Sequence, residues 1–298
     1  MIPDECANQR QQDDRRRHTF PRERAAHAGW GRAVTFAILT FGGLAAGFLA
    51  GLFGLGGGLI MVPVLVYAFN SLGVAAPHIV LLAIGTSMAA IVFSTAQSAY
   101  GYFRRGTACG ATVHRVAPWA IVGVLLGSML AGHASRSQLL VFVAGFQFFA
   151  GALILVDVSR FAIVRRIAGQ AAALDVFSVA FGGIAAMAGI GGGTLFTPYF
   201  VASGMEPRRA VGTSVAIGVP VSLAGAFAYA WEGRDVPLGH WTVGYIHLPA
   251  LCALVAGMML TVRLGVAAGH SLPPRVLLLA FVAFVIANGT HLLHFASE

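Results

Sequence analysis

The sequence predicts an all-α fold: a polytopic membrane helix bundle built from two repeated modules with glycine-broken, re-entrant half-helices. Three observations predict it: a membrane-like composition, apolar runs of bilayer length, and a duplicated glycine-rich element. Of the 298 residues, 57% are hydrophobic and only 10% are charged, whereas charged residues make up about 25% of soluble domains. The composition therefore excludes an ordinary soluble protein.

The charge balance is basic, with 19 Lys+Arg against 11 Asp+Glu and a formal net charge of +8. In a soluble protein this balance would indicate nucleic-acid binding. Here every basic residue is an arginine, and the arginines stand between apolar runs, as in the cytoplasmic loops of membrane proteins. We therefore expect the lipid bilayer as a partner and no nucleic acid.

Four regions follow from this pattern. Residues 1–32 hold too few apolar side chains to form a core, so we expect a disordered, arginine-rich cytoplasmic tail. Membrane repeat 1 covers residues 33–158 and membrane repeat 2 covers residues 176–298, with a cytoplasmic linker at residues 159–175. The predicted location is the inner membrane, with several crossings and a cytoplasmic N-terminus.

The apolar runs predict the membrane segments in order. A hydrocarbon core is about 30 Å thick, and eight runs are interpreted as crossing it: 33–53, 79–103, 116–133, 138–158, 176–190, 210–231, 243–263 and 276–294. Two shorter runs, 59–69 and 194–202, each follow a glycine cluster and are predicted to be re-entrant half-helices.

The number of crossings depends on the two short runs. If they do not cross, the chain has eight crossings, the two copies are parallel, and both termini lie inside. If they cross, it has ten crossings and the copies are inverted. The link that holds Arg104, Arg105 and Arg115 favours the first interpretation, because short arginine-rich links stay in the cytoplasm.

Two motifs occur twice. Gly54-Leu-Gly-Gly-Gly58 with Pro63 recurs as Gly189-Ile-Gly-Gly-Gly193 with Pro198, at the same spacing to the proline. Downstream, Gly85-Thr86-Ser87 recurs as Gly212-Thr213-Ser214. The duplication indicates two copies of one module.

Non-helical backbone is tolerated at membrane depth only where it is buried in protein or lines a cavity. The half-helices that begin near Leu59 and Thr194 would point their positive N-terminal ends at that place, which makes an anion site without lysine or arginine. The candidate substrate-binding residues are Gly54, Gly56, Gly57, Gly58, Pro63, Thr86, Ser87, Gly189, Gly191, Gly192, Gly193, Thr194, Pro198, Thr213 and Ser214.

Structural roles are the alternative for these residues. Glycines allow close helix packing in membranes, and serine or threonine hydroxyls bond helix backbone. Gln147, in the middle of a span, is interpreted as a helix-to-helix hydrogen-bonding residue.

Chemistry other than anion binding finds little support. No aspartate or glutamate lies near the middle of a predicted span, which argues against a cationic substrate. The three cysteines have neither metal-ligand nor redox-motif spacing, and no nucleophile can be paired with a histidine. We expect a small anionic substrate, no cofactor, no metal and no enzyme activity. A second copy of the chain, in a homo-oligomer, is a further partner that the sequence allows.

With both motifs in hand, the chain resembles the sulfite exporter TauE/SafE family of membrane permeases. The residues that carry the resemblance are Gly51-Leu-Phe-Gly-Leu-Gly-Gly-Gly58 with Pro63, Ala188-Gly-Ile-Gly-Gly-Gly193 with Pro198, and Ala210-Val-Gly-Thr-Ser214. The first copy departs by reading Ile84-Gly85-Thr86-Ser87, without Ala-Val before the motif.

The resemblance implies a permease for sulfur-containing anions such as sulfite, sulfoacetate or related sulfonates. An anion channel and a non-transporting membrane assembly protein are the alternatives.

Overall fold

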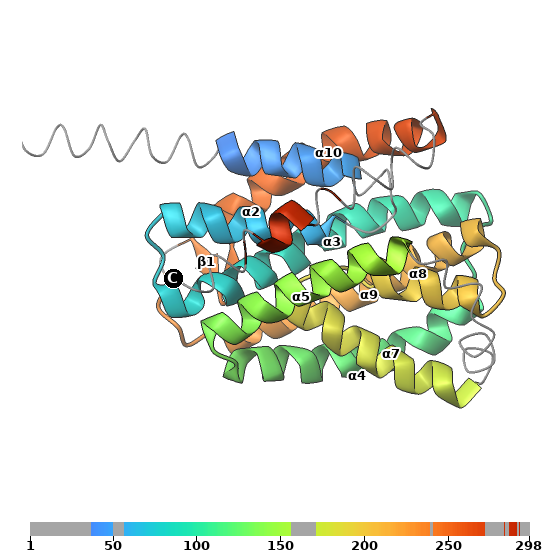
Figure 1. Cartoon of the computed structure of the whole chain (residues 1–298), viewed down its shortest axis with the longest axis horizontal. Coiled ribbons are helices and arrows are strands. Elements are labelled where there is room, and N and C mark those ends of the chain that lie inside the picture. Colours follow the sequence, from blue (N-terminus) through green and yellow to red (C-terminus); the bar gives the residue numbers. More distant parts are fainter. Residues whose placement is uncertain are drawn as a thin grey trace, which may run out of the picture.

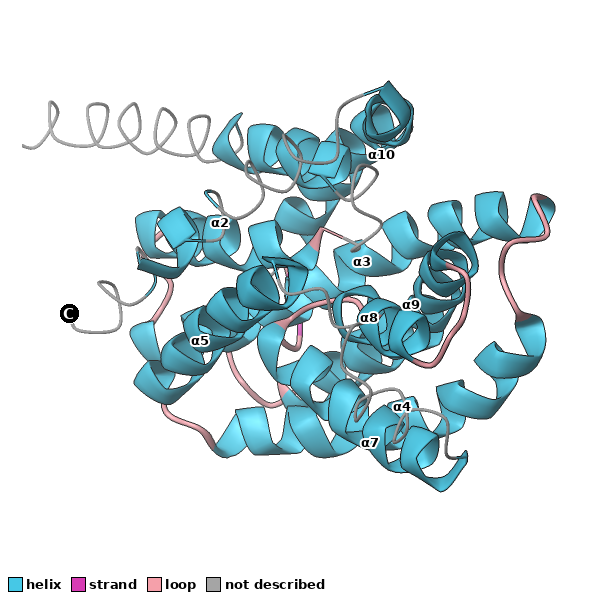
Figure 2. Ribbon diagram, turned by 45° about the vertical axis from the view of Figure 1, so that its right-hand side comes forward, coloured by secondary structure: helices cyan, strands magenta, loops and turns pink. Residues whose placement is uncertain are grey.

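The computed structural model describes residues 37–49, 57–155, 171–238, 241–271, 283, 286–290 and 292. This part of the chain is almost entirely helical (Figure 2). Its elements are the first helix (Ala37–Leu49), α2 (Gly58–Ser71), the 3-10 turn η1 (Ala76–His78), α3 (Ile79–Arg104), α4 (Gly110–His133), α5 (Arg136–Leu155), α7 (Ala171–Ala188), α8 (Gly193–Ala202), α9 (Pro207–Glu232), β1 (Thr242–Val243), β2 (Ile246–His247) and α10 (Leu248–Ser271). The all-α prediction is confirmed.

Several helices are long and apolar enough to cross a membrane: Ala76–Arg104, Gly110–His133, Pro207–Glu232 and Leu248–Gly265. The chain is therefore a multi-pass membrane protein. One predicted span differs at its start, because the run 243–263 begins with a β-hairpin in which Thr242 pairs with His247. The positive φ of 54° at Gly244 makes the turn of this hairpin, and the helix begins only at Leu248.

The two half-helices α2 and α8 are short, as predicted. They hold 14 and 10 residues, which corresponds to about 21 and 15 Å of helix, against about 30 Å for the hydrocarbon core. The described part of the run 33–53 is the apolar helix Ala37–Leu49. Both α2 and α8 leave the middle of the molecule, towards its opposite ends (Figure 1).

The helices α3 and α9 lie against each other and run in opposite directions. Beta carbons placed on Gly225, Gly218 and Gly212 of α9 would meet, in that order, the side chains of Met88, Thr95 and Tyr102 of α3. Residue numbers rise along one helix as they fall along the other, so the pair is antiparallel. Because each helix carries one copy of Gly-Thr-Ser, the parallel orientation expected of the copies is wrong. The number of crossings stays open, since parts of the chain lie outside the described residues.

Helix α7 packs on α4 backbone to backbone. A Cβ on Gly123 would overlap the carbonyl group of Val179, and one on Gly127 would overlap that of Gly183. At one end of this pair, Arg115 and Asp175 form an ion pair with an N–O distance of 3.3 Å. The close approach depends on glycine, which is the usual arrangement where helices associate inside a bilayer.

The first helix packs on α10 in the same way. A Cβ on Gly43 would lie 2.7 Å from the carbonyl oxygen of Leu254, and one on Gly47 would lie 2.5 Å from the Cα of Met258. The hydroxyl of Thr261 also donates to the carbonyl of Leu44 at 2.7 Å. The opening helix on each side of the linker therefore packs on a helix from the other side, and the two halves of the chain interlock.

We expect the substitution Gly127→Leu to destabilise the protein by more than about 1–3 kcal/mol, the usual cost of overpacking, because the obstacle is backbone rather than a movable side chain. The measurement is thermal unfolding of the purified protein in detergent. Gly145→Leu is the control, because a Cβ at Gly145 meets no atom within 4 Å. Equal melting temperatures for the two variants would contradict the proposed backbone contact.

Candidate functional site

The two glycine-rich elements meet at the N-terminus of α2. Gly57 is the N-cap, with φ 76° and ψ −5°, a left-handed conformation that favours glycine. A Cβ on Gly58 would lie 2.7 Å from the carbonyl oxygen of Gly189 and 2.8 Å from the Cα of Ile190. Gly189 also has a positive φ, 65°. Backbone of one element therefore touches backbone of the other, and no side chain fits between them.

The remaining glycines of the second element lie at the start of α8. A Cβ on Gly191 would lie 2.9 Å from the Cγ2 of Ile91, while Gly192 is the N-cap and Gly193 the first residue of the helix. All three are buried. Gly54 and Gly56 of the first element lie outside the described residues.

Neither half-helix has a side-chain cap at its N-terminus. The first N–H groups of a helix have no partner within it, and they carry the positive end of the helix dipole. Both starts are buried. Two uncapped helix starts near one another form an arrangement that attracts negative charge.

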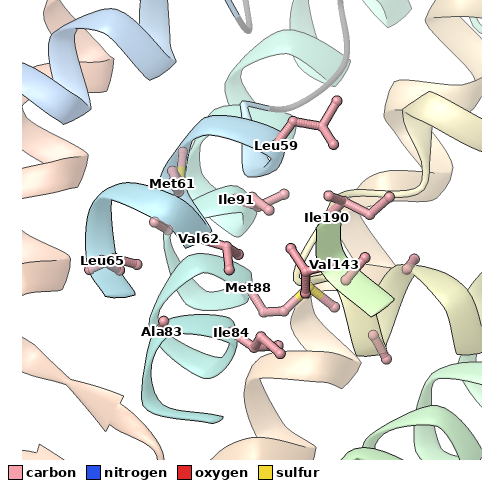
Figure 3. Packing of buried hydrophobic residues seen from close by; sticks show 14 of the residues in the cluster. Leu59, Met61, Val62, Leu65, Ala83, Ile84, Met88, Ile91, Val143 and Ile190 are labelled. Atoms are coloured by element: carbon pink, nitrogen blue, oxygen red, sulfur yellow. The ribbon is translucent and has the colours of Figure 1, made fainter. Parts of the chain in front are cut away.

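The surroundings of this meeting point are apolar. Figure 3 shows Val62, Ile84, Met88, Ile91 and Ile190 packed around it, and all five are at most 1% exposed. In such surroundings the dielectric constant is low, so hydrogen bonds and helix dipoles act more strongly than in water.

The two prolines that follow the glycine elements at equal spacing lie inside the short helices, Pro63 in α2 and Pro198 in α8. Proline has no N–H, so Pro63 cannot donate to the carbonyl of Leu59 four residues earlier. The side-chain amide of Gln147 on α5 supplies the missing donor, with Nε2 at 3.3 Å from the Leu59 oxygen. The interpretation of Gln147 as a helix-to-helix hydrogen-bonding residue is confirmed.

The threonines of the Gly-Thr-Ser motifs bond the opposite half of the chain. Thr86 accepts a hydrogen bond from the backbone N–H of His247 at 3.0 Å, and Thr213 accepts one from the backbone N–H of Cys109 at 3.0 Å. His247 immediately precedes α10, and Cys109 immediately precedes α4. The two bonds are thus matching contacts, one at each end of the antiparallel pair α3 and α9.

The glycines of the same motifs make the approach possible. A Cβ on Gly85 would overlap the carbonyl oxygen of Tyr245, two residues before His247. A Cβ on Gly212 would lie 3.0 Å from the carbonyl oxygen of Thr107, two residues before Cys109. In both copies the glycine therefore admits a loop from the other half, and the threonine then holds it.

The serines differ between the copies. Ser87 donates to the carbonyl of Gly189 at 2.9 Å, which links α3 to the second glycine element. Ser214 donates to the carbonyl of Ala210 at 2.7 Å, within its own helix. All four hydroxyl-bearing residues of the motifs are fully buried. Their hydrogen bonds in this structure are to backbone groups, and a role in substrate binding stays a prediction.

The ring of His247 supports the loop that Thr86 holds. Its Nδ1 accepts the N–H of Ala250, in the first turn of α10, at 3.2 Å, and the ring packs edge-on against Phe69, 5.3 Å between centroids. Burial lowers the pKa of His247, so the ring stays neutral and able to accept this bond. Sequence reasoning missed this loop, because the partner of Thr86 is a backbone group that no side-chain pattern reveals.

Short helices that begin at buried glycine elements, without side-chain caps, together with several apolar spans are typical of polytopic membrane transporters. The profile of the sulfite exporter TauE/SafE family matches residues 39–292, and the chain belongs to this family.

Individual relatives carry transporter names. The chain is 31% identical over 250 residues to a probable membrane transporter protein of Haemophilus influenzae, covering 82% of this chain and 92% of the relative. It is 24% identical over 283 residues to the probable membrane transporter protein YunE of Bacillus subtilis, covering 88% and 98%. A probable membrane transporter protein of Methanocaldococcus jannaschii is 22% identical over 241 residues, covering 80% and 88%. No solved structure matches the chain significantly. These names indicate a membrane transporter rather than an enzyme.

We expect Thr86→Val and Thr213→Val each to lower the free energy of unfolding by about 1–3 kcal/mol, because each leaves a buried backbone N–H without its acceptor. Thermal unfolding in detergent measures the effect. Thr95→Val is the control, since the hydroxyl of Thr95 bonds the carbonyl of Ile91 in its own helix at 2.7 Å. Losses no larger than that of the control would mean that the cross-half hydrogen bonds do not stabilise the fold.

Proposed function

We propose that this transporter moves a small sulfur-containing anion, such as sulfite, sulfoacetate or a related sulfonate, across the inner membrane as a secondary carrier. The substrate is held between the N-termini of α2 and α8. The observation that carries the proposal is the contact of the two uncapped glycine elements, where Gly58 lies against Gly189 and Ile190.

The hydrogen-bond donors at the N-termini of α2 and α8 suit an oxyanion. The N–H groups of the two helix starts point positive partial charge at one buried region, and no lysine or arginine is needed to neutralise the substrate. A site of backbone amides can bind an anion and let it leave, because it holds no full opposite charge. The family name supports a sulfur oxyanion as the substrate class.

The antiparallel arrangement of α3 and α9 supports a carrier. Each end of this pair has one glycine-threonine contact to a loop of the other half. Alternating access needs two ends that open in turn around a fixed central site, and related elements at the two ends suit that requirement.

We expect Gly57→Leu and Gly192→Leu each to abolish anion counterflow in liposomes while leaving the protein inserted. Leucine at Gly57 is forced into a left-handed conformation, and leucine at Gly192 places a side chain at the start of α8, 2.8 Å from the Phe196 ring at its Cβ. The assay uses sulfite, sulfoacetate, thiosulfate, sulfate and chloride.

Gly145→Leu is the matched control, because it adds the same side chain to a site with open space. Saturable exchange of one sulfur oxyanion, lost in the two site variants and kept in the control, is the result expected. Normal exchange in both site variants would refute the central anion site.

We also propose that the link between α3 and α4 faces the cytoplasm. Arg104 and Arg105 end α3, Arg208 and Arg209 begin α9, and the Cys109–Thr213 hydrogen bond brings these ends together. The arginines are exposed, so the positive-inside rule applies to this end. The orientation of the tail stays a prediction, because residues 1–36 lie outside the described part.

A membrane-impermeant maleimide tests this orientation in whole cells, on variants in which the natural cysteines are replaced. Ala111→Cys lies at the arginine-rich end, and Ala75→Cys lies in the link between α2 and α3 at the other end; both positions are exposed. We expect labelling of Ala75→Cys alone. Labelling of Ala111→Cys alone would reverse the assignment.

A further inference from the structure

One side-chain atom of Gln147 has no hydrogen-bond partner in the described part of the chain. The residue is 1% exposed, in the middle of α5, and its Nε2 donates to the carbonyl of Leu59. Because a carbonyl can only accept, this bond fixes the nitrogen towards Leu59 and turns the oxygen away from it. The Oε1 atom is fully buried and has no hydrogen-bond partner among the described residues.

Thr194, in the first turn of α8, is the second such residue. It is 3% exposed, and its Oγ1 is also buried without a partner in the part of the chain that the structure describes. A series of contacts through α2 and the second glycine element connects the two residues. Leu59, the partner of Gln147, is adjacent to Gly58, and Gly58 lies against the Gly189–Ile190 backbone that leads into α8.

A buried polar atom without a partner is costly, and natural proteins rarely keep one without a reason. In an apolar membrane interior the cost is not relieved by bulk water. The helix starts supply only donors, whereas Oε1 of Gln147 supplies an acceptor and Oγ1 of Thr194 can act either way. The region therefore suits a ligand that accepts hydrogen bonds over most of its surface and donates one.

We propose that Gln147 is a specificity-determining residue of the transport site, whose Oε1 accepts a hydrogen bond from an O–H group on the anion. The inference rests on the proposed function and narrows its substrate class. The preferred substrate is a sulfur oxyanion that carries its own hydroxyl, a hydroxyalkylsulfonate. Backbone amides hold the oxyanion, and Gln147 selects for the hydroxyl.

The selectivity follows from the cost of an unsatisfied acceptor. A site that is built to bond a hydroxyl rejects the analogue without one, because the buried acceptor then stays unpaired. One such bond corresponds to at least about tenfold in affinity. Helix starts alone would bind both anions equally, since both carry the same sulfonate group.

The test compares isethionate with ethanesulfonate, which differ only by the terminal hydroxyl. Saturable exchange of each ³⁵S-labelled anion is measured in liposomes that contain the full-length protein. For the wild type we expect a half-saturation concentration for isethionate at least about tenfold lower than that for ethanesulfonate. We expect Gln147→Leu to bring this ratio close to one. Loss of the Nε2 bond to Leu59 affects both anions alike, whereas loss of Oε1 weakens isethionate specifically.

Ser178→Ala is the control, because Ser178 is buried but bonds only the carbonyl of Leu174 in its own helix; its ratio should equal that of the wild type. If Gln147→Leu does not fold, Gln147→Met is the second variant, because it also removes Oε1, and its ratio should likewise approach one. Equal half-saturation in the wild type overturns the role of Gln147 and leaves anion transport standing. Exchange of neither sulfonate overturns the substrate class, and the role of Gln147 with it.

Discussion

The contact between Gly58 and the Gly189–Ile190 backbone is the constraint on which the arrangement of this protein depends. Side chains are excluded there, so two short helices can start almost at the same point inside the bundle. Hydrogen bonds from two further helices reach the same place. Pro63 can leave a carbonyl without its helical partner because α5 passes near enough for Gln147 to replace it. On α3, Ser87 lies close enough to the second glycine element to donate its hydroxyl to the carbonyl of Gly189.

Inside a bilayer the hydrophobic effect gives little reason for helices to associate, since lipid tails are as apolar as the side chains they would replace. The interlocking of the two halves therefore relies on backbone packing and on hydrogen bonds. Glycines bring α4 to α7 and the first helix to α10, while Thr86 and Thr213 each hold a loop from the other half. Separating the halves would expose these polar groups together, which makes the arrangement cooperative.

Much of this fold could be predicted from the sequence, because long apolar runs and glycine breaks are local signals. The helices α3, α4 and α9, the shortness of α2 and α8, and the family all follow from such signals. The relative direction of the two copies could not be predicted in this way. Hydropathy locates the apolar runs but does not show which of them cross the bilayer completely, and the direction of the second copy depends on that number. The hydrogen-bond partners of Thr86 and Thr213 could not be predicted either. Both partners are backbone N–H groups, which every residue except proline has, so no residue type marks them. The substrate role of the duplicated glycines remains a prediction.

The two ends of the α3–α9 pair share one hydrogen bond but differ in what surrounds it. The link from α3 to α4 is short, whereas that from α9 to α10 contains the β-hairpin, whose Tyr245 backbone N–H donates to the carbonyl of Tyr229 at 3.1 Å. Tyr229 in turn donates its hydroxyl to the carbonyl of Ala186 on α7. Opening the hairpin end would require these hydrogen bonds to break together. The β-hairpin, α9 and α7 would therefore have to separate together for that end to open, because one path of hydrogen bonds runs through all three.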